Sequence, residues 1–163
     1  MTAASRDLAH LRRCVALAAE AVEAGDDPFG SVLVDAGGAV LAEARNREIS
    51  SADPTAHPEL ELAQWAAKHL PPDARAAASV YTSGEHCPMC AAAHAWVGLG
   101  RIVFAASSAQ LAGWRSEWGL AAGPVAVLPV AVVAPGTPVT GPVPPVDQEM
   151  RMLHERAASR KPS

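Results

Sequence analysis

Residues 85–90 read Glu-His-Cys-Pro-Met-Cys. The proline suits the first turn of a helix, which the sequence predicts over residues 88–97. Cys87 and Cys90 then lie one helical turn apart at the helix N-terminus, where the backbone dipole favours the thiolate. By itself such a pair fits a redox pair, half of a structural zinc site or part of a catalytic one. The chain has three cysteines, which is too few for a four-sulfur structural site.

An upstream stretch narrows these alternatives. Residues 55–60 read Thr-Ala-His-Pro-Glu-Leu and open a helix predicted over residues 58–69. His57 adds an imidazole and Glu59 a carboxylate, so that the chain offers a His/Cys/Cys ligand set for zinc and a free acid. Three protein ligands leave the fourth tetrahedral position for water, whose pKa zinc lowers toward about 7. We therefore expect Zn²⁺ as the cofactor and Glu59 as the group that moves protons.

Strands and helices alternate along most of the chain. The predicted helices cover residues 6–24, 58–69, 88–97 and 146–158, and the predicted strands cover residues 31–34, 39–44, 78–82 and 101–105. A Pro/Val-rich connection from about residue 123 could contain an edge strand near residues 125–133. The alternation predicts an α/β layered domain whose chemistry lies at one edge of the sheet.

Composition limits the class of protein. The 163 residues are 50% hydrophobic, which is enough for a substantial core, and we expect a single domain over residues 1–163. A net charge of −4 lacks the broad positive field of proteins that bind nucleic acid non-specifically. No apolar stretch reaches the roughly 20 residues that span a bilayer. We therefore expect a cytoplasmic protein with a small-molecule partner and no membrane partner.

The two stretches resemble the cytidine-deaminase-like superfamily, in the branch that contains guanine deaminases, fungal-type cytosine deaminases and tRNA adenosine deaminases. The resemblance covers roughly residues 9–105. It implies a three-layer α/β/α sandwich around a five-stranded mixed sheet, assembled as a homodimer. It also implies the roles of the side chains: zinc ligation by His57, Cys87 and Cys90, proton transfer by Glu59, and substrate binding by Asn46 and Phe29.

Other residues bear on the substrate. Pro58 departs from the branch, because it lacks the backbone N–H that could donate to a substrate carbonyl. Glu117 falls where the branch supplies a substrate-facing segment, so its carboxylate could pair with N–H donors of a base. His86 is expected to be a solvated loop histidine. His94 lies one turn after Cys90 and is a conceivable fourth ligand that would close the site.

The sequence thus favours a hydrolytic deaminase that removes an exocyclic amino group from a free nucleobase or related heterocycle. Guanine, modified guanine, isoguanine, cytosine analogues and amino-triazines are the candidates. A tRNA adenosine deaminase is one alternative, although Arg151, Arg156, Arg160 and Lys161 offer only a modest basic patch. A non-catalytic scaffold stabilised by zinc is an alternative of another class.

Overall fold

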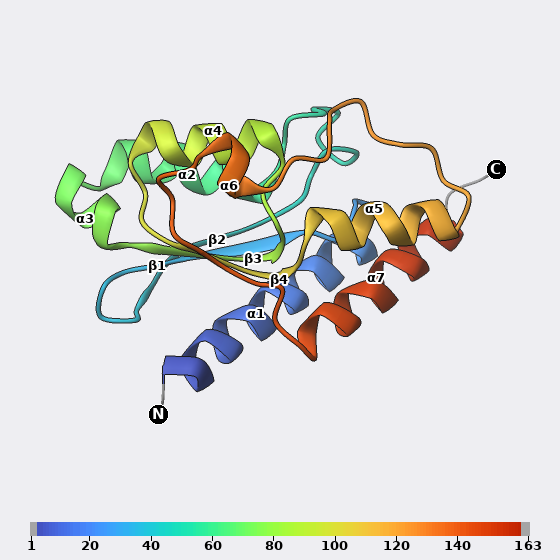
Figure 1. Cartoon of the computed structure of the whole chain (residues 1–163), viewed down its shortest axis with the longest axis horizontal. Coiled ribbons are helices and arrows are strands. Elements are labelled where there is room, and N and C mark those ends of the chain that lie inside the picture. The colour runs from blue at the N-terminus through green and yellow to red at the C-terminus, as the bar shows by residue number, and fades with distance from the viewer. Residues whose placement is uncertain (1–2, 161–163) are drawn as a thin grey trace.

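A five-stranded mixed sheet forms the centre of the computed structural model, which describes residues 3–160 (Figure 1). The strands are β1 (Gly30–Val34), β2 (Val40–Arg45), β3 (Ser79–Gly84), β4 (Ile102–Ala106) and β5 (Val139–Thr140), in the order β2-β1-β3-β4-β5. β1 is antiparallel to β2 and β3, whereas β4 is parallel to β3 and β5. The carboxyl ends of β3 and β4 therefore lie at the same edge of the sheet.

The hairpin between β1 and β2 is closed by a polar turn. The Asp35 carboxylate accepts hydrogen bonds from the backbone N–H groups of Gly37 and Ala39, at 2.8 and 2.9 Å. Gly38 has a φ of 92°, which glycine adopts without the steric cost that a side chain would carry. The turn fixes the antiparallel pairing that the sequence predicts for these strands.

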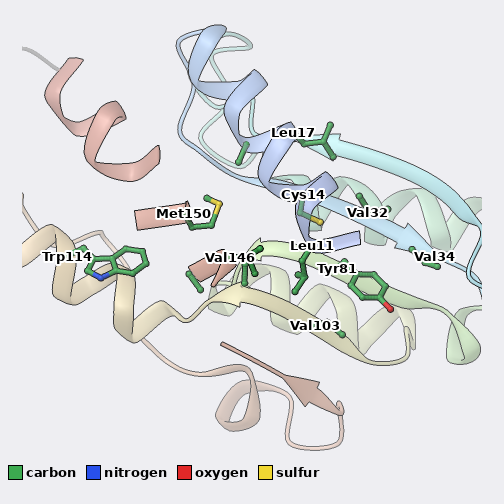
Figure 2. Close-up of a cluster of buried hydrophobic side chains, with 13 residues drawn as sticks. Leu11, Cys14, Leu17, Val32, Val34, Tyr81, Val103, Trp114, Val146 and Met150 are labelled. Carbon is green, nitrogen blue, oxygen red and sulfur yellow. The ribbon is translucent and has the colours of Figure 1, made fainter. Parts of the chain in front are cut away.

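Three helices cover one face of the sheet: α1 (Ala3–Glu23), α5 (Ser108–Glu117) and α7 (Val146–Arg160) (Figure 1). Their apolar side chains meet those of the strands in the cluster of Figure 2, where Leu11, Val32 and Met150 are fully buried. Each such side chain contributes about 1.5–3 kcal/mol when it leaves water. α1 packs tightly against Gly30, where an added Cβ would lie 2.4 Å from the Cβ of Leu17.

The other face carries α2 (Pro58–His69), α3 (Pro72–Ala77), α4 (Pro88–Val97) and the short α6 (Val130–Val133) (Figure 1). Leu62 of α2 packs with Leu33 and Val80 of the sheet in a second buried cluster. The molecule is therefore the three-layer α/β/α sandwich around a five-stranded mixed sheet that the family resemblance implies, and that prediction is confirmed.

The predicted edge strand near residues 125–133 is wrong. Residues 120–129 have no regular structure, and Val130–Val133 form α6. Pro124 and Pro129 explain the difference, because neither has the N–H that a strand needs for its ladder. The fifth strand is Val139–Thr140 instead. Within residues 3–160, no helix is both long and apolar enough to cross a membrane.

Candidate active site

Two helix starts bring the predicted ligands together. His57 is the N-cap of α2 and Cys87 is the N-cap of α4, and both helices begin with a proline. The loop with Cys87 follows the carboxyl end of β3, and α2 packs against α4 on the same face of the sheet (Figure 1). Both N-cap residues have the extended backbone that is usual at this position.

The distances among the ligand atoms suit one zinc ion. His57 Nδ1 lies 3.6 Å from the Sγ atoms of both Cys87 and Cys90. The ligand atoms of the three residues all lie within 4.8 Å of one another. A tetrahedral zinc with ordinary Zn–N and Zn–S bond lengths places nitrogen and sulfur about 3.6 Å apart. His57, Cys87 and Cys90 therefore form a set that could hold Zn²⁺ as three of its four ligands.

Protons are shared unevenly among these three groups. Hydrogen bonds from Cys90 and His57 lower the pKa of Cys87 to about 4. The bond to Cys87, reinforced by Glu48, raises the pKa of His57 to about 10. The bond that Cys90 donates to Cys87, together with burial, raises the pKa of Cys90. Metal binding needs a neutral imidazole and two thiolates, so it releases protons and strengthens as pH rises.

Glu59 lies beside the ligands, in the first turn of α2, with 6% of its surface exposed. Its Oε1 accepts a hydrogen bond of 2.8 Å from Thr82 Oγ1, which in turn accepts one of 2.8 Å from Ser31 Oγ. Both hydroxyls are fully buried in the sheet. Burial raises the pKa of Glu59. The carboxyl is thus fixed in direction and accepts a proton more readily than an exposed glutamate.

A cavity of about 460 Å³ opens over His57, Glu59 and Cys87. Its volume is within the range of small-molecule sites. Phe29 and His154 form part of the wall, and their rings meet edge to face with centroids 5.1 Å apart. Aliphatic side chains of α5 and of the loop after it also line the cavity: Leu111, Leu120, Val125, Val127 and Leu128.

The predicted substrate-binding residues lie in different places. Phe29 lines the cavity. Asn46 is 1% exposed, is not among the residues that line the cavity, and bonds to Glu48 through both polar atoms of its side chain. Glu117 is exposed at the end of α5, where it pairs with Arg151 at 2.7 Å and does not line the cavity. Substrate binding by these three residues stays a prediction.

Two histidines near the site have structural partners. His86 is 1% exposed rather than solvated, because it packs edge to face against His94 with ring centroids 5.4 Å apart. His94 Nε2 lies 2.7 Å from the backbone oxygen of Gly100. His94 is therefore held by the turn after α4 and does not belong to the group of ligand atoms, so the structure does not support the alternative in which it is a fourth ligand.

Sequence reasoning missed most of the other residues that line the cavity, among them His154 and Glu85. His154 comes from α7, far along the chain, and no local motif marks it. The Glu85 carboxylate accepts hydrogen bonds from the backbone N–H groups of Ser108, at 3.0 Å, and Val130, at 2.9 Å. It therefore joins the loop before Cys87 to the start of α5 and to the end of the loop over the cavity. α5 was not predicted from the sequence. Ser107 and Gln110 form a capping box at its start, and this pair was the signal that could have revealed the helix.

Comparison with known proteins gives a family match. The family described as the cytidine and deoxycytidylate deaminase zinc-binding region matches residues 4–106. A guanine deaminase of Bacillus subtilis is 41% identical over 103 residues, which is 63% of this chain and 65% of that protein. A tRNA-specific adenosine deaminase of Haemophilus influenzae is 35% identical over 97 residues, 60% of this chain and 56% of the relative. The chain thus spans less than two thirds of these relatives.

A solved structure extends the similarity beyond the matched region. The structure of guanine deaminase from Bacillus subtilis superposes with a TM-score of 0.58 at 31% identity. It covers 83% of this chain and 91% of the other. The match includes more of the chain than the family region, which ends at β4.

Proposed function

Because this chain belongs to the cytidine and deoxycytidylate deaminase zinc-binding family, we propose that it is a hydrolytic deaminase of a free nucleobase or related heterocycle. The observation that carries the proposal is the placement of His57 Nδ1 at 3.6 Å from each of two sulfurs, with a buried carboxylate two residues away. That arrangement offers three metal ligands and a proton carrier, and His57, Glu59 and Cys87 line one cavity.

The reaction consumes water and releases ammonia, and an exocyclic C–NH₂ becomes C=O. Zinc, when bound, makes a water molecule acidic enough to act as a nucleophile near neutral pH. The Glu59 carboxylate would take a proton from the attacking water and pass it to a ring nitrogen of the substrate. A second proton transfer, to the amino nitrogen, lets ammonia leave as the C=O bond forms. The raised pKa of Glu59 supports this task, because the protonated form persists to higher pH.

The cavity favours a small heterocycle over a nucleic acid. Its apolar wall and the Phe29 ring suit the flat face of a base. The C-terminal arginines that could contact phosphates are paired: Arg151 with Glu117, and both Arg156 and Arg160 with Glu23. Lys161, the other residue of that basic patch, lies outside the described residues. The candidate substrates remain guanine, modified guanine, isoguanine, cytosine analogues and amino-triazines.

An ammonia-release screen of the zinc-loaded protein against these bases, their nucleosides and tRNA tests the proposal. We expect turnover of at least one free base, and a loss of at least about 100-fold in Glu59→Gln, which retains the metal. Turnover of tRNA alone would support the alternative in which the chain is a tRNA adenosine deaminase. Metal binding without ammonia release from any substrate would support the scaffold.

A further inference from the structure

The carboxylate of Glu48 lies between a metal ligand and Asn46. Its Oε1 is 3.1 Å from His57 Nε2, the ring nitrogen on the side away from the sulfurs. Its Oε2 accepts a hydrogen bond of 2.8 Å from Asn46 Nδ2. The backbone N–H of Glu48 donates to Asn46 Oδ1 at 3.0 Å. Neither the motif nor the ligand spacing pointed to Glu48.

We propose that Glu48 is a positioning residue for the metal site, and that Asn46 acts on the site through it. The inference rests on the zinc site of the proposed function. A neutral imidazole has one N–H, and its position decides which nitrogen can bind a metal. An Nε2–H that donates to Glu48 leaves the Nδ1 lone pair free and directed at the two sulfurs.

The backbone around Glu48 holds its carboxylate in place before any metal arrives. The buried carboxylate of Asp26 accepts the N–H groups of Ile49 and Ser50, at 3.0 and 2.8 Å, and the Ser50 hydroxyl at 2.7 Å. The N–H of Asp53 donates to the Glu48 backbone oxygen at 3.1 Å. Because these bonds fix the turn after Glu48, its carboxylate needs little reordering to hold the imidazole.

Asn46 completes the arrangement from the strand side. Its own N–H donates to the Phe29 backbone oxygen at 2.9 Å, and its side chain is buried. The side-chain amide of Asn46 has two N–H hydrogens and one oxygen. One N–H donates to the Glu48 carboxylate, and the oxygen accepts the Glu48 backbone N–H. Asn46 therefore holds the carboxylate on the side opposite to His57. This geometry predicts that losing Asn46 changes metal binding as well as any contact with substrate.

The test measures zinc affinity by competition with a chromophoric chelator, and the absorption spectrum of the Co²⁺-substituted protein. Glu48→Ala is expected to weaken zinc binding 10–100-fold and to shift the Co²⁺ bands, because the imidazole loses its partner. Glu48→Gln should lose less zinc affinity, since an amide oxygen can still accept the Nε2–H of His57. Glu61→Ala is the matched control: that carboxylate lies on α2, is 45% exposed and pairs with Arg47, so its removal should leave both readouts unchanged.

Asn46 supplies the second arm. Asn46→Ala should also weaken zinc binding. Zinc affinity in the double variant with Glu48→Ala should fall by less than the product of the two single fold-losses. An Asn46→Ala protein with the parent's zinc affinity would show that Asn46 does not act through Glu48. Circular dichroism checks that each variant is folded. If Glu48→Ala is unfolded, the zinc affinity and Co²⁺ spectrum of Glu48→Gln are compared with those of Glu61→Gln instead.

The outcomes separate this inference from the proposed function. If the parent binds zinc and releases ammonia while Glu48→Ala keeps the parent affinity and Co²⁺ spectrum, the positioning role is wrong and the deaminase stands. If Glu48→Ala loses affinity but no heterocycle is turned over by the parent, the positioning role stands without the deaminase. A parent protein that binds no zinc overturns both.

Discussion

Replacing Thr82 with valine removes one buried hydroxyl and keeps the branched shape of the side chain. The change deletes the 2.8 Å bond to the Glu59 carboxylate and leaves the Ser31 hydroxyl without its acceptor. A hydrogen bond to a charged group contributes about 1.5–3 kcal/mol and a neutral one about 1 kcal/mol. The free energy of unfolding should therefore fall by about 2.5–4 kcal/mol, which denaturant unfolding measures.

The same substitution should affect turnover more than substrate binding. Thr82 does not line the cavity, so KM should change little. Glu59 loses the donor that fixes its direction, and a loss of about 1.4–2.7 kcal/mol in transition-state stabilisation corresponds to a 10- to 100-fold fall in kcat. Thr82→Ser keeps the hydroxyl and should retain most of the activity. A Thr82→Val enzyme with the parent's kcat, or a serine variant as slow as the valine one, would refute this reasoning.

Three further predictions follow from other parts of the site. Hydrogen bonds from Ser50 and Ile49 outweigh burial and lower the pKa of Asp26, so Asp26→Asn should cost about 2–3 kcal/mol of unfolding free energy at pH 7. That difference should narrow as pH falls below about 4, because the folded-state advantage of the carboxylate is lost as it is protonated, and urea unfolding at several pH values checks it. His154→Ala should raise KM several-fold with little change in zinc content, because the ring lines the cavity beside Phe29, and steady-state kinetics measures both constants. A chelator should lower the melting temperature of the zinc-loaded protein, because the ion joins the starts of α2 and α4, whereas Cys90→Ser should show a much smaller shift in a thermal scan.

Local patterns predicted the helix starts well. A proline after His57 and another after Cys87 mark the first turns of α2 and α4, and the structure begins both helices there. The convergence of the two starts depends on tertiary structure, namely the parallel pairing of β3 with β4 and the packing of α2 on α4. No single stretch encodes that pairing, and only the residue types suggested that the imidazole and the sulfurs belong to one site.

The C-terminal third was harder to predict, for physical reasons. Its Val- and Pro-rich composition suggests a strand, but the prolines remove the N–H groups that a strand needs. His154 lines the cavity because α7 packs across α1 and β4, which is a long-range contact without a local motif. His86 was expected in solvent because loop residues are usually exposed, whereas the helix that follows it covers the ring. The homodimer, the cytoplasmic location and the single domain stay predictions.

A hydroxyl beside Glu59 suits a group that must gain and lose a proton. When Glu59 is ionised, Thr82 Oγ1 donates its hydrogen to the carboxylate at 2.8 Å. When Glu59 is protonated, the carboxylic acid can donate to Thr82, whose own hydrogen then turns to the Gly84 backbone oxygen at 3.0 Å. The hydroxyl thus has a partner in both states, and only its hydrogen rotates. An asparagine at this position would have to turn its whole amide over, from N–H donor to C=O acceptor, to satisfy both states. Thr82→Asn should therefore lower kcat even where circular dichroism shows that the protein stays folded.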